Sequence, residues 1–291
     1  MLSIVLPKGS LERATLQLFE DADLAVQRSS DVDYRATIDD PRVSDVRILR
    51  PQEIPRYIAE GRFDLGVTGR DWVEETGATV VSLAELHYSK ATALPIKIVL
   101  AVAADSPAQT VRDLPAGVRV HTEYPELTRR YFTEHGIDAE VSLSYGATEA
   151  KVPDIADAVV EITETGRALR AAGLKILDTM LLSFTELIAN PASHADPEKR
   201  KAMEQLQTLL TGALEARGRV LLKLNVDEAN LATVIELLPA LKAPTVSKLF
   251  GADAYAVESV VAKTEINTLI PDLKERGATG IIELPIAKIV H

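Results

Sequence analysis

Polar residues suited to anion binding follow three apolar runs in the first part of the chain. They stand in "LPKGS", "LRP" and "VTGRDW", and are Lys8, Gly9, Ser10, Arg50, Arg70 and Asp71. Lysine and arginine bind phosphate, backbone amides at a strand-to-helix turn favour an anion, and a carboxylate accepts hydrogen bonds from hydroxyls or an amine. Each stretch alone fits an ordinary turn equally well, with a solvated arginine or a serine cap. Together they predict a phosphate-binding edge.

A second candidate is the small-residue stretch "GATEA", which follows an apolar run and precedes a predicted helix. Its residues are Gly146, Ala147, Thr148, Glu149 and Ala150. Small side chains let several backbone amides approach one phosphate, and the Thr148 hydroxyl adds a donor. Glu149 suits ribose hydroxyls or a metal ion better than a phosphate. The structural alternative is a turn capped by Thr148 or Glu149.

The acidic residues of "ADAVVEI" alternate with apolar ones, as in a strand with two distinct faces. Asp157, Val159 and Glu161 share one face of the predicted strand. Glu161 lies nearer the carboxyl end, where ligands collect in α/β sheets, so we favour it as a functional residue. Thr165 and Gly166 follow, and we interpret Thr165 as the cap of another helix.

Apolar runs alternate with amphipathic segments along the chain. The predicted strands include "LSIVLP", "VRILRP", "FDLGVTG", "IKIVLAVA", "VRVHT", "AEVSLSYG" and "ADAVVEI", and helices are predicted at about residues 11–23, 51–60 and 125–136. This alternation indicates an α/β fold with a largely parallel sheet. The chain is expected to leave one α/β unit near residues 93–107 and to return through the strand-rich segment 176–191.

The last third of the chain has a different pattern. Asp196 is a predicted cap for a long amphipathic helix that ends at Gly218. From residue 219 the order of predicted elements is βαββαβ, which is the ferredoxin-like arrangement. A ligand-sensing module and an oligomerisation platform both fit this segment.

Composition excludes several classes of function. The 43 acidic residues exceed the 32 basic ones, giving a net charge of −11 and a pI near 5.1, which argues against nucleic acid as a partner. The absence of cysteine excludes disulfides and thiolate zinc sites, and the five histidines lack metal-ligand spacing. We find neither a signal peptide nor an apolar run of about 18 residues, so a cytoplasmic protein without membrane contact is expected.

Over essentially its whole length the chain resembles the long form of the ATP phosphoribosyltransferase family, which opens histidine biosynthesis. The resemblance rests on "LPKGSL", "RPQEIP", "DLGVTGRDW", "YGATEA", "ADAVVEITETGRAL" and "LPALKAPTVSKL". The family signature has an acidic residue on a strand followed by Thr-Gly-x-Thr-Leu. This chain has Glu161 where aspartate is usual and Ala168 where threonine is usual.

The resemblance implies two α/β lobes like those of type II periplasmic binding proteins, with a ferredoxin-like domain after them. Residues 1–93 and 183–218 would form the first lobe, residues 94–182 the second, and residues 219–291 a histidine-binding regulatory domain. The implied reaction joins N1 of the ATP adenine to phosphoribosyl pyrophosphate and releases pyrophosphate, with Mg²⁺ as cofactor. The partners would be both substrates, histidine as inhibitor, and further copies of the chain in dimers and hexamers.

The resemblance also suggests a role for each candidate residue. Glu161 and Lys8 would be catalytic, residues 146–150 would bind phosphoribosyl pyrophosphate, and the six residues of the phosphate-binding edge would bind ATP. Thr245 and Ser247 share one face of a short predicted strand and would bind histidine. No residue is predicted to hold the metal. The alternatives are a non-catalytic binding protein or a regulatory subunit on the same two lobes.

Overall fold

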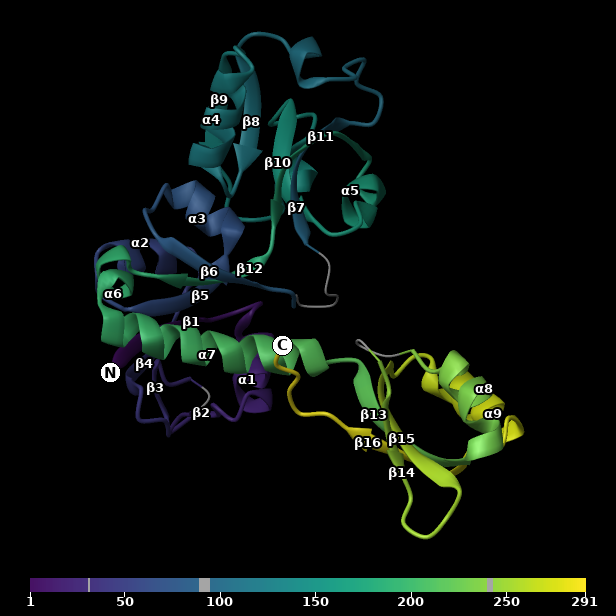
Figure 1. Cartoon of the computed structure of the whole chain (residues 1–291). Helices are drawn as coiled ribbons and strands as arrows, with labels where there is room; N and C mark the ends of the chain where they lie inside the picture. The colour runs from purple at the N-terminus through teal and green to yellow at the C-terminus, as the bar shows by residue number, and fades with distance from the viewer. Residues whose placement is uncertain (31, 89–94, 240–242) are drawn as a thin grey trace. The chain divides into compact units, whose positions relative to one another are not determined.

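The computed structural model describes residues 1–30, 32–88, 95–239 and 243–291. The chain divides into two compact units, Met1–Gln207 and Thr208–His291. The described residues form three sheets, two in the first unit and one in the second (Figure 1). The predicted lobe boundary between residues 93 and 94 lies outside the described residues.

The first sheet has the strand order β2-β3-β4-β1-β5-β12-β6. Its strands are β1 (Leu2–Pro7), β2 (Val26–Gln27), β3 (Arg35–Ile38), β4 (Val43–Leu49), β5 (Leu65–Gly69), β6 (Val81–Leu86) and β12 (Thr185–Ala189). Only β4, β1 and β5 run parallel; the other neighbours are antiparallel. The prediction of a largely parallel sheet is therefore wrong. The connection from β3 to β4 is too short for the crossover that a parallel pair requires.

The parallel part of this sheet brings predicted site residues together. Pro7 of β1 is in register with Leu49 of β4, and the Lys8 amide donates to the Leu49 carbonyl at 2.6 Å. The carboxyl ends of β1, β4 and β5 therefore share one edge. The helices α1 (Glu12–Asp21), α2 (Ile54–Ala59) and α3 (Arg70–Thr76) follow these strand ends.

The second sheet has the order β11-β7-β10-β8-β9 and is also mixed. Its strands are β7 (Ile96–Ala103), β8 (Val118–Thr122), β9 (Ala139–Leu143), β10 (Ala158–Thr163) and β11 (Leu174–Ser183). The shorter elements are η1 (Val111–Asp113), α4 (Pro125–Glu134), η2 (Thr148–Lys151) and α5 (Arg167–Ala171). The helix expected after "GATEA" is therefore one 3₁₀ turn, η2.

The predicted alternation of side chains between the two faces of β10 is confirmed, because each face packs in a different cluster. Ala158 and Val160 pack in a cluster with Phe132 of α4, whereas Val159 packs in another cluster with Leu169 of α5. β11 leads into β12 across Phe184 alone, so the chain returns from the second sheet to the first where the strand-rich segment was predicted. β10 is thus rigidly held on both faces.

A buried carboxylate fastens the end of the first lobe to its sheet. Asp64 is 8% exposed and accepts hydrogen bonds from the Ser3 amide at 2.8 Å, the Ser193 hydroxyl at 2.6 Å and the Lys199 ammonium at 2.7 Å. Ser193 lies in α6 (Pro191–Ala195) and Lys199 in α7 (Pro197–Ala216). Asp196 accepts from the Lys199 amide at 3.1 Å, which confirms it as a helix cap.

We expect Asp64→Asn to destabilise the protein by about 1 to 3 kcal/mol, because its amide would face the Lys199 ammonium and break a partly buried pair. Burial raises the pKa of Asp64, but hydrogen bonds from Lys199, Ser193 and Ser3 lower it below the ordinary value. The stabilisation is therefore present above pH ~4 and lost as pH falls through the lowered pKa. Urea unfolding at pH 7 and pH 3 measures both effects. Glu60→Gln, which breaks only the exposed pair with Arg62, should change stability by less than about 1 kcal/mol.

The third sheet confirms the predicted βαββαβ order. Its strands β13 (Arg219–Asp227), β14 (Thr245–Lys248), β15 (Ala254–Ala262) and β16 (Thr279–Pro285) form an antiparallel sheet in the order β14-β15-β13-β16. The helices are η3 (Glu228–Asn230), α8 (Leu231–Leu237) and α9 (Ile266–Glu275). Val234 of α8 and Leu273 of α9 pack with Leu222 and Val257 of the sheet, so these helices cover one of its faces.

The second unit begins inside α7, whereas the predicted domain starts at residue 219. The C-terminal residues account for this earlier boundary, because the Ile289 amide donates a hydrogen bond to the Gly212 carbonyl at 2.9 Å. A Cβ atom at Gly212 would lie 3.1 Å from the Val290 side chain, so glycine permits this close approach. The last residues therefore join the final turns of α7 to the ferredoxin-like sheet. In the part of the chain that the structure describes, no helix has the length and apolarity to span a bilayer.

Candidate active site

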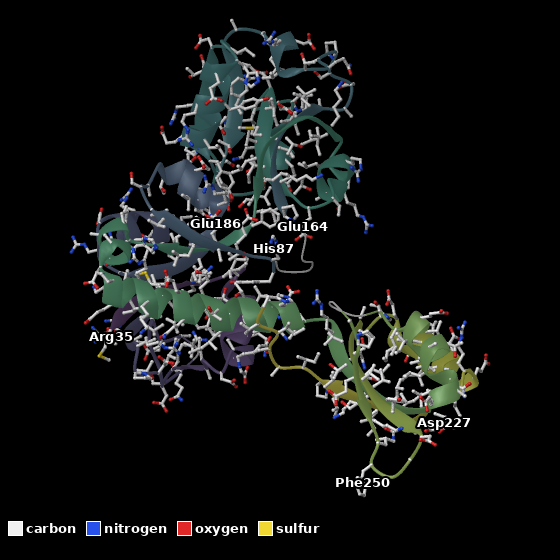
Figure 2. The ribbon with its side chains drawn as sticks, viewed as in Figure 1. Arg35, His87, Glu164, Glu186, Asp227 and Phe250 are labelled. Carbon is white, nitrogen blue, oxygen red and sulfur yellow. The ribbon has the colours of Figure 1, made fainter. Side chains whose placement is uncertain are left out.

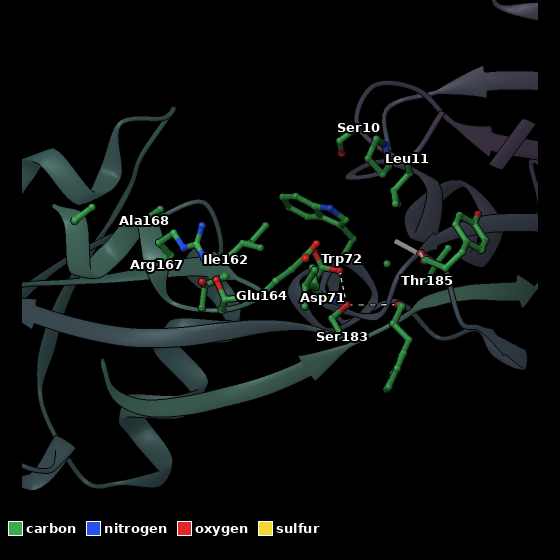
Figure 3. Close-up of a pocket in the computed structure, with 18 residues that line it drawn as sticks. Ser10, Leu11, Asp71, Trp72, Ile162, Glu164, Arg167, Ala168, Ser183 and Thr185 are labelled. Carbon is green, nitrogen blue, oxygen red and sulfur yellow. Dashed lines mark hydrogen bonds between the residues drawn. The ribbon is translucent and has the colours of Figure 1, made fainter. Parts of the chain in front are cut away.

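A cavity of about 730 Å³ opens between elements of the two lobes in the first unit (Figure 3). Ser10, Leu11 and Pro51 line it from the strand ends of the first sheet. Facing them, the end of β10, the loop after it and the first turn of α5 contribute Thr163, Glu164, Thr165, Arg167 and Ala168. This volume lies within the range of about 300 to 1,000 Å³ typical of small-molecule sites.

Asp71 lies where the two lobes meet at the floor of this cavity. It is 2% exposed, accepts a hydrogen bond from the Ser183 hydroxyl at 2.7 Å, and accepts another from the Tyr124 hydroxyl at 2.7 Å. Burial raises the pKa of Asp71 in spite of these donors. Trp72, which also lines the cavity, packs on Tyr124 with ring centroids 4.6 Å apart. Asp71 of α3 is therefore held by two hydrogen bonds, one from Tyr124 of the second lobe and one from Ser183 at the end of β11.

The loop between β10 and α5 belongs to the site, but its residues were not predicted from the sequence as site residues. Gly166 has φ +71°, and its amide donates to the Thr163 hydroxyl at 2.7 Å, which turns the loop toward the cavity. Gly166 itself is the N-cap of α5, so the interpretation of Thr165 as that cap is wrong. The Arg167 side chain is exposed and lines the cavity. The Thr-Gly pair of the family signature was the available signal.

The stretch at residues 146–150 lies elsewhere. None of its five residues lines the cavity. Gly146 has φ +120° and Ala147 φ +46°, which turn the chain back onto β10. Thr148 is 0% exposed, and its hydroxyl lies 2.8 Å from that of Ser144. The predicted role of this hydroxyl as a surface donor to phosphate therefore does not fit its position.

Glu161 is half-buried on β10, beside Ile162, which lines the cavity. Burial raises the pKa of Glu161, and the negative charges of Glu123 and Glu149 raise it further. The hydrogen bond that the Ile162 amide donates at 3.0 Å lowers the pKa again, and the nearby Thr148 hydroxyl acts in the same direction. A cationic group beside Glu161 would be strongly attracted by this concentration of negative charge.

The predicted cations are placed differently from one another. Lys8 lies 4.0 Å above the centre of the Tyr34 ring, and Arg50 is exposed after β4. Neither lines the cavity. Pro51, next to Arg50, does line it, whereas Gly9, next to Lys8, lines a separate pocket. Arg70 instead pairs with Glu74 at 2.6 Å and with the buried Glu186 at 3.6 Å. Arg70 therefore does not line the cavity either.

Among the described residues, no group of three or more acidic or histidine side chains could hold a metal ion. The described residues thus present no protein cage for Mg²⁺, which commonly binds through substrate phosphates with only one or two carboxylates. The cavity instead combines exposed backbone at a turn, an arginine and a buried carboxylate.

The fold and the cavity define a class of protein: a two-lobed α/β core with a cavity lined from both lobes, followed by a ferredoxin-like domain. The chain belongs to the ATP phosphoribosyltransferase family. The model of that family matches residues 50–212, and the model described as HisG, C-terminal domain, matches residues 216–288. The predicted family and fold are confirmed.

Curated relatives named ATP phosphoribosyltransferase extend along the whole chain. The relative from Solibacter usitatus is 46% identical over 290 residues, covering 100% of this chain and 99% of the relative. The one from Nitratidesulfovibrio vulgaris is 48% identical over 291 residues, covering 100% and 98%. Among solved structures, the ATP phosphoribosyl transferase (HisG:HisZ) complex from Thermotoga maritima matches 72% of this chain and 99% of its own, with a TM-score of 0.61 and 24% identity. That likeness concerns the fold alone.

Proposed function

We propose that this chain transfers the phosphoribosyl group of phosphoribosyl pyrophosphate to N1 of the ATP adenine and releases pyrophosphate. Membership of the family supports this activity, and one observation in the structure carries the assignment: the cavity is lined from both lobes, so two substrates can enter from opposite sides. The cytoplasm, where both substrates occur, is the proposed compartment.

The 5′-phosphate of phosphoribosyl pyrophosphate is assigned to the turn after β10. Thr163, Thr165 and the Arg167 guanidinium line the cavity there, whereas residues 146–150 do not. A phosphate on this turn would accept hydrogen bonds from backbone amides and hydroxyls and would pair with Arg167. This assignment replaces the predicted one.

ATP is assigned to the opposite wall. Ser10 and Pro51 line the cavity beside the predicted residues Lys8, Gly9 and Arg50, whose positive charges would meet the ATP phosphates. Asp71 and Trp72 lie deeper, where a carboxylate can accept from the adenine amino group and an indole can pack on the ring. Arg70 supports this wall through Glu74 and Glu186.

The reaction needs alignment and electrostatic stabilisation more than covalent help. As the bond from C1 to pyrophosphate breaks, positive charge develops on the ribose. Glu161 lies one residue from the cavity wall and concentrates negative charge with its neighbours, so it would stabilise that charge or bind the ribose hydroxyls. The two walls would hold adenine N1 in line with C1. Mg²⁺, when bound, would neutralise charge on the pyrophosphate, and because the described residues form no cage, we assign it no residue.

An absorbance assay tests the activity. Purified protein with ATP, phosphoribosyl pyrophosphate and Mg²⁺ should give the ultraviolet absorbance change of an N1-substituted adenine, and the change should require both substrates. A non-catalytic binding protein or a regulatory subunit would bind ATP in calorimetry without this change. That result would refute the proposed activity.

Histidine inhibition and self-association are proposed for the ferredoxin-like unit. Thr245 and Ser247 lie on the edge strand β14, opposite Glu258 and Ala256 of β15. Glu258 pairs with Lys223 at 2.7 Å, so hydroxyls and both charges lie together, as an amino acid would require. Phe250, fully exposed at the tip of the β14–β15 hairpin (Figure 2), supports contact with further copies of the chain in dimers or hexamers.

We expect Thr245→Ala with Ser247→Ala to raise the histidine concentration for half-inhibition about 10-fold, since allosteric coupling is typically ~1 to 3 kcal/mol. Activity without histidine should stay near that of the wild type. The measurement is inhibition at limiting and saturating ATP, with mass from light scattering. Thr233→Ala with Thr268→Ala, in the helices that cover the other face, is the matched control. Unchanged sensitivity of the first pair would leave the unit as an assembly domain.

A further inference from the structure

Helix α3 belongs to the first lobe and also contacts the second, at α4 and β11 (Figure 1). On one side of the helix, Val73 packs in a cluster with Val5 and Ile188 of the first sheet. On the other side, Trp72 packs against the core of the second lobe, which contains Phe132 of α4. The helix that carries the wall assigned to ATP is therefore also the junction between the lobes.

The carboxylate of Glu75, in the last turn of α3, accepts hydrogen bonds from the first backbone amides of α4. The Glu126 amide donates at 3.0 Å to one carboxylate oxygen, and the Leu127 amide donates at 2.9 Å to the other. The side chain of a helix-capping residue usually accepts from amides in these positions. The cap position of α4 is occupied by Tyr124, whose hydroxyl donates to Asp71 instead. Glu75 therefore caps a helix of the other lobe.

The spacing of residues in α3 places this contact beside the cavity. Asp71 and Glu75 are four positions apart, so they lie on one face of the helix. Both accept hydrogen bonds from the corner between β8 and α4, Asp71 from the Tyr124 hydroxyl and Glu75 from the amides just after it. A further contact runs in the opposite direction, because the Arg130 guanidinium of α4 donates to the Glu74 carbonyl at 2.5 Å. Contacts spread along the helix fix its orientation against the second lobe, which the bond at Asp71 alone would leave free to turn.

The electrostatic environment shows what the contact supplies to Glu75. Burial raises the pKa of Glu75, and the hydrogen bonds from the Leu127 and Glu126 amides lower it, so these amides replace part of the lost water. The Glu126 carboxylate raises this pKa and the positive charge of Arg130 lowers it. A glutamine at position 75 could accept from one amide, but its own amino group would face the other. Glu75→Gln therefore breaks the contact without changing the size of the side chain.

We propose that Glu75 is a positioning residue, which holds the wall assigned to ATP in the alignment with the second lobe that phosphoribosyl transfer requires. The inference rests on the proposed function. Asp71 and Trp72 of α3 are assigned to the adenine, whereas the turn after β10 in the second lobe is assigned to the 5′-phosphate. Glu75 itself does not line the cavity. The alignment of the two substrates then depends on how the lobes are held, and a misplacement of about 1 Å can cost roughly 100-fold in rate.

Steady-state kinetics of Glu75→Gln is the first test. The variant should lower kcat about tenfold, while the KM values for ATP and phosphoribosyl pyrophosphate change less than about threefold. The residues assigned to each substrate stay in place within their own lobe, so binding is kept while alignment in the transition state is lost. Glu134→Gln is the matched control, because Glu134 is exposed at the other end of α4, and it should leave kcat unchanged.

Tryptophan fluorescence tests the junction independently of activity, because the chain has a single tryptophan. Trp72 lies three positions before Glu75 and packs on Tyr124 with ring centroids 4.6 Å apart. In the protein without substrates, Glu75→Gln should shift the emission to longer wavelength and increase quenching by acrylamide, since a looser junction admits water to the indole. Glu134→Gln should change neither property. Melting temperatures are recorded for every variant.

Arg130→Met tests the junction from the second lobe and does not depend on the folding of Glu75→Gln. It removes the bond to the Glu74 carbonyl and should lower kcat about threefold, with the same direction of change in Trp72 emission. Arg129→Met is its control, because Arg129 contacts Glu126 and the Val141 carbonyl, both within the second lobe. This control should leave kcat and the emission unchanged.

Three results would overturn the inference and leave the proposed function in place. An unchanged kcat in Glu75→Gln would show that the contact merely caps α4. A raised KM for ATP with an unchanged kcat would show that Glu75 acts on nucleotide binding. A lowered kcat without a change in Trp72 emission would show that the effect does not arise at the junction. Absence of activity in the wild type would instead refute the proposed function, and this inference with it.

Discussion

Gly166→Val is expected to lower kcat/KM for phosphoribosyl pyrophosphate at least about 100-fold, the loss expected for two hydrogen bonds to a charged phosphate. Gly166 has φ +71°, which strains any residue with a Cβ atom. The new Cβ would lie 2.8 Å from the Arg170 guanidinium and 3.2 Å from Ile176. The arginine can move, but the backbone must relax toward negative φ, which withdraws the turn and Arg167 from the cavity.

Two matched glycines separate this effect from general strain. Gly117→Val places a β-branched residue at φ +75° in a turn of the second lobe that does not line the cavity, so kcat/KM should stay within about threefold. Gly146→Val tests the stretch first predicted to bind the phosphate, and should change the KM for phosphoribosyl pyrophosphate little, because residues 146–150 do not line the cavity. If Gly146→Val raised that KM about 100-fold and Gly166→Val did not, the phosphate would belong to residues 146–150.

The elements themselves could be predicted because local patterns determine them. The alternation of "ADAVVEI" describes a strand packed on both faces, and β10 is one, with Val160 and Val159 in separate clusters. The order βαββαβ after residue 218 follows from the same kind of signal. Strand direction could not be predicted in this way, since it depends on how each connection crosses the sheet. The short link from β3 to β4 indicates an antiparallel pair, but β3 was not among the predicted strands.

The site was harder to predict, because its residues meet through contacts that are distant in sequence. Asp71 and Tyr124 are 53 positions apart, and Asp71 and Ser183 are 112 apart. Nothing in "VTGRDW" indicates that its carboxylate is buried beneath two hydroxyls. Likewise "GATEA" has the small residues of a phosphate loop, yet the Thr148 hydroxyl is buried against that of Ser144. The ends of the strands indicate where a site forms, but only the three-dimensional packing shows which turn lines that site.

Asp71→Asn is expected to lower kcat/KM for ATP roughly 100-fold, at the upper end of the effect of one hydrogen bond to a charged group, because a neutral amide accepts more weakly from the adenine amino group. Stability should change by less than about 1 kcal/mol, since removing a buried charge offsets the poorer hydrogen bonds. Tyr124→Phe should instead reduce stability. It leaves the buried carboxylate with one donor fewer and should lower the free energy of unfolding by about 1 to 3 kcal/mol.

The pH dependence of stability provides an independent check on Asp71. Burial raises the pKa of Asp71, so the folded state binds its proton more tightly than the unfolded state does. The stability that this group contributes is therefore greatest below its ordinary pKa of ~4 and falls as pH rises through the raised value. Relative to Asp71→Asn, the wild type should lose unfolding free energy between pH 4 and pH 7. Urea unfolding of both proteins across this range measures the difference. A flat difference would show that burial does not raise this pKa, and an unchanged kcat/KM for ATP in Asp71→Asn would show that the carboxylate does not contact the nucleotide.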